Sequence, residues 1–320
     1  MAVCRLVHLL ETGQYELCLE EAQTLLAAGA RESADQARTY AAICRCRLEL
    51  GDWPAAAAAG DQALLLSAQE ADPDLVGSVL ADLGTARARL RQYPSALEAC
   101  ERFLHMLPGL TGTCCREGTV RRQMAEVLQR MGRTERAGEA YAAARRWFQR
   151  FGDEQSEWDC VRAMIDIGLE TGDLGAVVAL LEEGDRRLAN ADRPFRSDQL
   201  RDWARYELAA GRPGRAAECA FLALEVGVGL EQQGKAQMVL CLAALQQDRP
   251  VEALAFALAA RVSAMEGNLY CLEFDAAEVI FRLLRHHGTR LLDEVAADFE
   301  RQGVNIYEYL SELAVRRCVT

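Results

Sequence analysis

Basic runs and aromatic–basic interleaving do not stand out in this sequence. Its 320 residues hold 36 Lys and Arg against 48 Asp and Glu, a net charge of −12, and Lys235 is the single lysine. A nucleic-acid-binding protein normally carries a basic stripe. We therefore expect no direct nucleic-acid partner.

Long apolar runs are also missing. No window of 18 residues is uninterruptedly apolar, so we predict no membrane span and no membrane partner. At the N-terminus, His8 interrupts a short apolar run and acidic residues follow, which argues against a signal peptide. The 12 cysteines are spread through a large chain with a helical pattern, and this favours a reducing cytoplasm over a disulfide framework.

Motifs for catalysis or metal binding are lacking as well. The four histidines do not pair with cysteines or carboxylates at metal-ligand spacing. Cys44 and Cys46 are two residues apart on one predicted helix, so their side chains point apart. We predict no catalytic residue, metal, cofactor or enzymatic activity.

Cys114 and Cys115 leave two interpretations open. They stand at a predicted helix N-terminus beside Arg116, and both features lower the pKa of a thiol and make it reactive. No second cysteine follows at the spacing of a redox pair, so a structural role is the alternative that the sequence favours.

What the sequence does contain is a unit of about 40 residues, most regular at Leu80–Pro108. The pattern predicts a helix ending near Leu90, a turn at Arg91–Tyr93 and a second helix opened by Pro94. The same short turn recurs at intervals of 37 to 41 residues, with these turn residues: Gly13, Gly51, Arg91, Gly132, Gly172, Gly211, Asp248 and Gly288.

Residue size repeats at fixed distances from these turns. Eight residues before the turn residue stand large apolar residues: Ile43, Leu83, Met124, Met164, Trp203, Leu240 and Ile280. Seven before it the residues are mostly small: Cys44, Gly84, Ala125, Ile165, Ala204, Cys241 and Phe281. Five after it they are small again: Cys18, Ala56, Ala96, Ala137, Val177, Ala216 and Ala253. Close-packed antiparallel helices require such alternation of large and small residues.

No segment alternates like a β-strand, so we predict an all-α protein: a right-handed α-solenoid (superhelix) of about eight antiparallel helix pairs. Residues 1–320 are expected to form one solenoid domain, with a capping pair at 1–30 and capping helices at 289–320. The first helix spans only Ala2–Glu11. This favours a frayed N-terminal cap, and loss of an upstream domain stays open as the alternative.

The repeats resemble the tetratricopeptide repeat (TPR) family. Leu83, Gly84, Tyr93, Ala96 and Pro108 fall at the signature places of that family, as do Gly51, Trp53, Ala56 and Ala63 in the preceding unit. Arg47 and Arg87 stand where the family usually has tyrosine, and the period exceeds the common one of about 34 residues. The longer period is similar to that of the sensor solenoids of bacterial signalling regulators.

The leading helices of such solenoids line a concave groove. Ten residues before three successive turn residues stand Arg122, Arg162 and Arg201, and six before them stand Glu126, Asp166 and Arg205. The resemblance implies that these places hold the backbone and carboxylate of a bound peptide. Leu208 and Leu242 continue the surface, so the predicted site turns from cationic to apolar.

The alternative for this row of arginines is pairing on their own helices. Arg122 stands four residues before Glu126, and Asp198 three before Arg201, which suits ion pairs of a few tenths of a kcal/mol. Arg201 and Arg205 belong to the repeat whose arginines are least neutralised by carboxylates in the sequence, so we expect these two residues to contribute most to binding.

Two functions fit this pattern. The first is a non-enzymatic scaffold that binds a protein or peptide segment, acidic or C-terminal, in the groove. The second is the ligand-responsive sensor module of a bacterial regulator, whose output domain lies outside this chain. The sensor hypothesis predicts a homodimer, and the scaffold hypothesis predicts a monomer.

Overall fold

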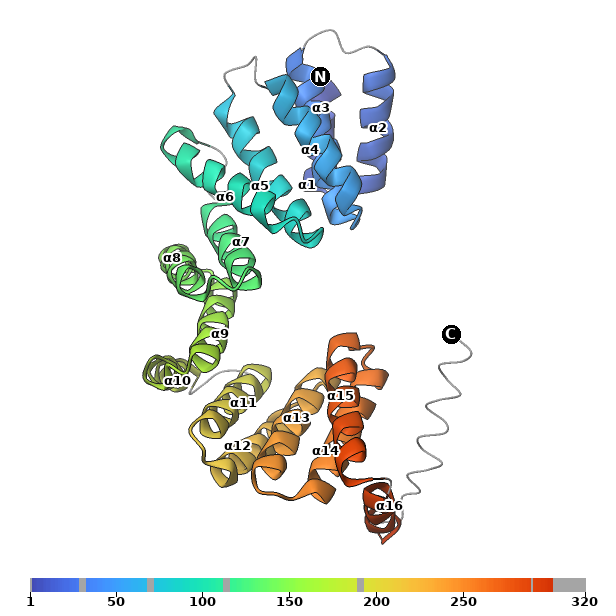
Figure 1. Cartoon of the computed structure of the whole chain (residues 1–320). Coiled ribbons are helices and arrows are strands. Elements are labelled where there is room, and N and C mark those ends of the chain that lie inside the picture. Colours follow the sequence, from blue (N-terminus) through green and yellow to red (C-terminus); the bar gives the residue numbers. More distant parts are fainter. Residues whose placement is uncertain are drawn as a thin grey trace. The chain divides into compact units, whose positions relative to one another are not determined.

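The computed structural model describes residues 2–28, 33–67, 72–111, 116–188, 193–288 and 290–301. Within these ranges the regular elements are helices alone, so the all-α prediction is confirmed (Figure 1). The helices are α1 (Ala2–Glu11), α2 (Tyr15–Ala27), α3 (Ser33–Glu49), α4 (Trp53–Ser67), α5 (Pro73–Arg89), α6 (Tyr93–Met106), the 3-10 helix η1 (Leu107–Gly109), α7 (Glu117–Arg130), α8 (Thr134–Phe151), α9 (Glu154–Thr171), α10 (Leu174–Leu188), α11 (Arg193–Ala209), α12 (Pro213–Val226), α13 (Leu230–Gln246), α14 (Pro250–Glu266), α15 (Tyr270–His287) and α16 (Arg290–Arg301).

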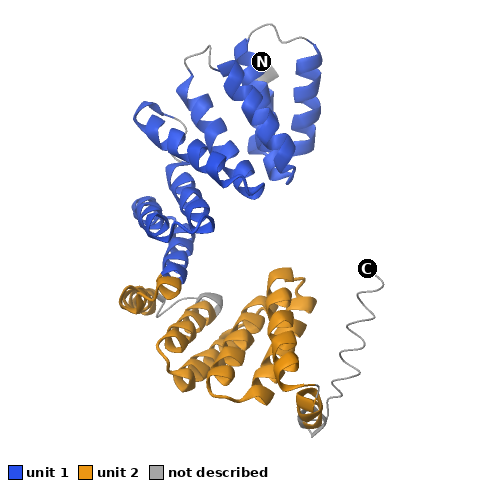
Figure 2. Cartoon of the chain, in the orientation of Figure 1, with its two compact units in different colours: residues 1–167 blue, residues 168–320 orange. Residues whose placement is uncertain are grey.

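The chain divides into two compact units, Met1–Ile167 (unit 1) and Gly168–Thr320 (unit 2) (Figure 2). In unit 1 each helix from α1 to α8 packs on the next, and the leading helices α1, α3, α5 and α7 also pack on one another. In unit 2 the helices from α10 to α15 pack in the same consecutive way, and α11 contacts α13. Each unit is thus a stack of helix pairs.

The predicted ends of the solenoid are helical where the structure describes them. The first pair is α1 and α2, and α16 follows the turn at Gly288. Residues 302–320, which complete the predicted C-terminal cap, lie outside the described residues. A single domain with two caps stays a prediction.

The turns between paired helices share a residue with positive φ, although ψ is 175° at Gly288 in the last of them. All eight predicted turn residues have a positive φ, between 55° at Asp248 and 79° at Gly51. After α5 the Gln92 N–H donates to the Arg87 carbonyl (2.9 Å) and the Arg91 N–H donates to the Ala88 carbonyl (3.1 Å). These two bonds define the Schellman motif, which satisfies carbonyls at the end of a helix. The repeat period is therefore marked by helix termination.

The small residues of the repeat lie in the core. All seven that follow the turn residue by five positions are 0% exposed: Cys18, Ala56, Ala96, Ala137, Val177, Ala216 and Ala253. Helix axes approach closely only where such small side chains face a neighbour. The predicted packing of large against small residues is confirmed at these positions.

Helix α15 departs from this rule. Seven residues before the turn residue, six repeats have a buried side chain or glycine, whereas Phe281 is 65% exposed. Fourteen residues before it the same six are buried again, whereas Phe274 is 70% exposed. These two positions face the next leading helix in a stack. Helix α15 is the last leading helix in the described part of the chain, so both rings stay uncovered there.

Two expectations from composition concern the described residues. None of their helices is both long and apolar enough to span a bilayer. Six of their cysteines are buried: Cys18, Cys44, Cys46, Cys100, Cys160 and Cys241. Burial raises the pKa of the Cys100 thiol to about 12, and does the same for Cys160 and Cys241. These cysteines serve as small apolar residues, as predicted for Cys44 and Cys46.

Candidate functional site

The eight predicted binding residues lie on leading helices of both units. In unit 1, α7 carries Arg122 and Glu126, and α9 carries Arg162 and Asp166. In unit 2, α11 carries Arg201, Arg205 and Leu208, and α13 carries Leu242.

In unit 1 Arg122 has carboxylates on two helices within reach. Its Nη1 lies 3.7 Å from Glu126 Oε1 on α7 and 3.7 Å from Asp159 Oδ2 on α9. Its buried Nε has no hydrogen-bond partner among the described residues. These long ion pairs support the alternative of pairing on the helix surface, although the guanidinium keeps a donor unused. Arg162 and Asp166 are half-buried on α9.

The expectation that Arg201 and Arg205 are the least neutralised arginines is wrong. Arg201 is only 6% exposed, and its Nη1 donates to Asp198 at 2.7 Å. Its Nη2 and Nε donate to Oδ1 of Asp202 at 3.0 and 3.3 Å. Burial is the reason for the error, because a buried guanidinium requires compensating carboxylates.

Asp202 is the residue that sequence reasoning missed here. It is 1% exposed, and the same Oδ1 also accepts from Arg205 Nη1 at 3.4 Å. Asp82 has the equivalent position in unit 1, nine residues before its turn residue, and accepts from Arg45 and Arg116. A charged residue inside an apolar repeat is the signal that would have revealed both carboxylates.

Unit 2 contains an apolar pocket beside Arg205, with a volume of about 350 Å³. It is lined by Leu169, Arg205, Leu208, Ala209, Leu242, Leu245 and Gln246. These residues come from α9, α11 and α13, which are successive leading helices. The structure thus brings together three of the predicted site residues, Arg205, Leu208 and Leu242.

The charged group of this pocket is Arg205, which lies beside an otherwise mainly apolar lining. Leu242 is 43% and Leu245 38% exposed, and together with Leu169 and Leu208 they form a contiguous apolar lining, which is more informative than a single exposed leucine. The Arg205 side chain is 34% exposed, so its guanidinium reaches both Asp202 and solvent. The pocket therefore presents an apolar wall with a cation at its rim.

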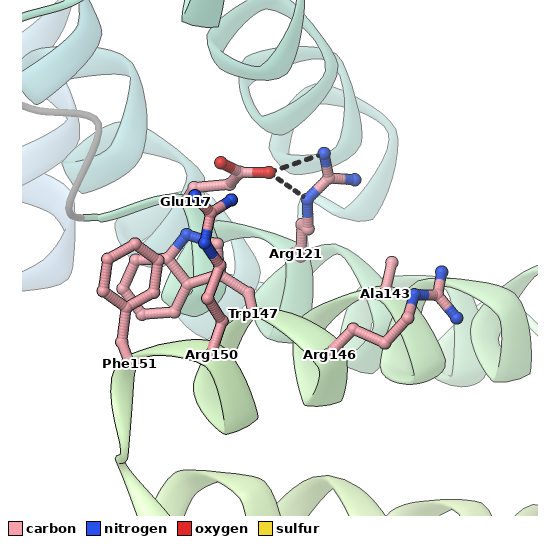
Figure 3. Close-up of a pocket in the computed structure, with 7 residues that line it drawn as sticks. All are labelled: Glu117, Arg121, Ala143, Arg146, Trp147, Arg150 and Phe151. Carbon is pink, nitrogen blue, oxygen red and sulfur yellow. Dashed lines mark hydrogen bonds and ion pairs between the residues drawn. The ribbon is translucent and has the colours of Figure 1, made fainter.

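A second pocket, of about 540 Å³, lies between α7 and α8 of unit 1 (Figure 3). It is lined by Glu117, Arg121, Ala143, Arg146, Trp147, Arg150 and Phe151. Figure 3 shows the Trp147 and Phe151 rings together at one end and Arg146 at the other.

Sequence reasoning missed this second pocket. The expectation that no aromatic–basic interleaving stands out is wrong for residues 145–151, Arg-Arg-Trp-Phe-Gln-Arg-Phe, at the end of α8. The interleaving itself was the available signal. The helical period decides which of these residues reach the pocket, because Arg145 and Phe148 turn to other faces of α8.

No site for a metal is found among the described residues, where no three His, Cys, Asp or Glu side chains cluster. Cys114 and Cys115 lie outside the described residues, so the two interpretations of this pair stay open.

No protein-family model matches the chain, and no curated protein sequence matches it. Solved structures do. The apo form of RapI aligns with a TM-score of 0.68 at 12% identity, over 98% of this chain and 92% of that one. The apo form of the quorum sensor NprR from B. thuringiensis aligns with a TM-score of 0.61 at 13% identity, over 98% of this chain and 97% of that one.

A tetratricopeptide repeat protein from Parabacteroides merdae aligns at 0.60 and 8% identity, over 88% of this chain and 97% of that one. The fold is that of the tetratricopeptide-repeat solenoids. At identities of 8 to 13% the likeness concerns the fold alone.

Proposed function

We propose that this chain is a peptide-binding solenoid whose unit 2 pocket receives one apolar side chain of a protein or peptide segment. Leu208, Leu242 and Leu245 supply the apolar wall, and Arg205 supplies the cation for a neighbouring or C-terminal carboxylate. The observation that carries the proposal is the pair of half-exposed leucines on α13 facing a pocket that an arginine borders.

Size and chemistry support this assignment. A volume of about 350 Å³ lies at the lower end of ligand pockets, which range from roughly 300 to 1,000 Å³. It suits a single large side chain better than a whole folded partner. A guanidinium holds a carboxylate with two parallel hydrogen bonds, which fixes the direction of a bound peptide.

The test is selection from a random heptapeptide library displayed with free C-termini. We expect the wild-type chain to enrich peptides that end in, or place a carboxylate beside, a large apolar residue. Leu242→Asp should reduce the affinity for the selected peptide by at least about tenfold, since it puts a carboxylate into the apolar wall. Calorimetry with the synthetic peptide measures this.

The matched control is Leu222→Asp, because Leu222 is 48% exposed on the second helix α12 of the same unit. It should bind as the wild type does. Equal binding by the Leu242 variant, or a selection without any enriched sequence, would overturn the proposal. Arg201 is unsuitable for this test, because its removal leaves the buried Asp202 without its main partner.

A regulatory sensor is the second candidate, and the likeness to the quorum sensor NprR over nearly the whole chain favours it. The sensor predicts a homodimer and a ligand-dependent change of shape, whereas the scaffold predicts an unchanged monomer. Small-angle scattering with and without the selected peptide separates the two.

A further inference from the structure

The pocket of unit 1 has the features of a second binding site. Helix α8 runs for 18 residues, and the second helices that are followed by described residues, α2, α6, α12 and α14, run for 13 to 17. Its last turn, which ends at the left-handed Gly152, carries Arg150 and Phe151 into the pocket. The last turn of α8 therefore forms part of the pocket wall.

Trp147 and Phe151 form an ordered aromatic wall. Their ring centroids are 4.3 Å apart at an interplanar angle of 33°, and Trp147 also meets the buried Phe148 edge-on at 5.4 Å. Gly118 makes room for the indole, because a Cβ there would lie 2.3 Å from Trp147 Cε3. Phe151 is 60% exposed. A fixed aromatic pair with one open ring is suited to stacking with a ligand.

The charges of this pocket are only partly balanced. Glu117 Oε1 accepts from both Nε and Nη2 of Arg121 at 2.7 Å, which occupies that arginine (Figure 3). Arg146 and Arg150, one helical turn apart, have no carboxylate of the described residues within ion-pair distance. Arg150 lies 5.7 Å from the centroid of Phe151. The pocket thus carries a local positive charge in a protein whose net charge is −12.

We propose that this pocket binds an acidic peptide segment that carries an aromatic side chain. Arg146 and Arg150 take the carboxylates, since guanidinium is the cation whose donors match them best. The ring of the peptide stacks on Phe151. This site is independent of the unit 2 pocket, which offers an aliphatic wall and one arginine.

Charge complementarity favours a short acidic peptide over a nucleic acid. A nucleic acid extends its phosphates beyond a pocket of this size, and the chain as a whole carries a net charge of −12, which disfavours a long polyanion. An acidic peptide of a few residues presents its carboxylates only where the arginines are.

The test uses the full chain and the blocked tetrapeptide acetyl-Glu-Phe-Glu-Glu-amide, with binding measured by calorimetry. We expect the double variant Arg146→Glu/Arg150→Glu to weaken binding by at least roughly tenfold, because two attractive charges become repulsive. The matched control is Arg102→Glu/Arg130→Glu, which makes the same change of charge at two exposed arginines outside the pocket. It should keep the wild-type affinity.

Two further comparisons isolate the aromatic contribution. Phe151→Ala should lower the affinity for this peptide to the affinity that the wild-type chain has for acetyl-Glu-Ala-Glu-Glu-amide. Circular dichroism should show unchanged helicity, because Phe151 lies on the surface. Leu242→Asp should leave the affinity unchanged, which separates this site from the pocket of unit 2.

The proposal is overturned if the double variant binds like the wild type, or if the uncharged acetyl-Gln-Phe-Gln-Gln-amide binds equally well. Tighter binding of an eight-nucleotide oligothymidylate that displaces the peptide would overturn it in favour of a nucleic-acid site.

Discussion

Single residues at the eight turns show how backbone conformation selects sequence. Six of the eight turn residues are glycine, which adopts positive φ without steric cost. The other two are Arg91 at 58° and Asp248 at 55°. A side chain in the left-handed region costs roughly 1–2 kcal/mol, which aspartate partly offsets by local hydrogen bonding and arginine does not. Arg91 is therefore the most strained of the turn residues.

Arg91→Gly should increase the free energy of unfolding by about 0.5–1 kcal/mol, because relief of strain exceeds the added entropy of the unfolded chain. Urea unfolding followed by circular dichroism measures the change. Arg89→Gly, two residues earlier within α5, is the control and should lower the free energy of unfolding by about 1 kcal/mol. A loss of stability in the Arg91 variant would contradict the strain argument.

Arginine residues at equivalent positions have different environments. Arg122, Arg162 and Arg201 repeat in the sequence, but Arg201 is buried against Asp198 and Asp202 while Arg122 is about one-third exposed. A repeat pattern predicts the position of a residue on its helix, but it does not predict the solvent exposure of the side chain. Arg205, at the rim of the unit 2 pocket, keeps both partial exposure and an apolar neighbourhood.

At the scale of the helix, the position seven residues before the turn residue is a contact between successive leading helices. Cys241 on α13 is 0% exposed and belongs to a core cluster with Ile280 of α15. Phe281 has the equivalent place on α15 and is 65% exposed. The same position therefore tolerates a large ring only where no described leading helix follows.

Cys241→Phe should lower the free energy of unfolding by about 1–3 kcal/mol, because the ring has no room between α13 and α15. Phe281→Ala should change it by less than about 0.5 kcal/mol, as expected for an exposed side chain. Thermal and urea unfolding of the two variants provide the comparison. Equal effects of the two substitutions would show that the position is not a packing contact.

At the scale of the whole molecule, buried thiols are distributed through both units. Burial raises the pKa of the thiols of Cys18, Cys44, Cys46, Cys100, Cys160 and Cys241, whereas the thiol of an unfolded chain has a pKa of about 8.5. Above that pH the unfolded chain binds fewer protons than the folded one, so stability is lost as pH rises. The eight tyrosines titrate in the same range, and burial raises the pKa of Tyr141 as well, so the contribution of one thiol has to be isolated by its own substitution.

Each buried thiol with a folded-state pKa near 12 should make the free energy of unfolding fall by about 1.4 kcal/mol per pH unit between roughly pH 9 and pH 12. Cys241→Ala should therefore give a shallower slope by about that amount. Cys271→Ala, which removes an exposed thiol, should leave the slope unchanged. Urea unfolding under reducing conditions at several pH values measures it, and identical slopes for all three chains would refute the assignment.

The sequence by itself determined the helix pairs, their turns and their small-residue contacts, because each repeat carries the same types of residue at the same positions. Positive φ requires glycine at most turns, and close helices require alanine or cysteine at a fixed distance. The candidate sites were decided by the tertiary structure. Burial placed Arg201 against Asp202, and the position of α8 beside α7 brought Arg146, Trp147, Arg150 and Phe151 into one pocket. The physical reason is that the solvation of a side chain depends on which neighbouring helix covers it. The sequence of one repeat does not specify where a neighbouring repeat departs from the common pattern.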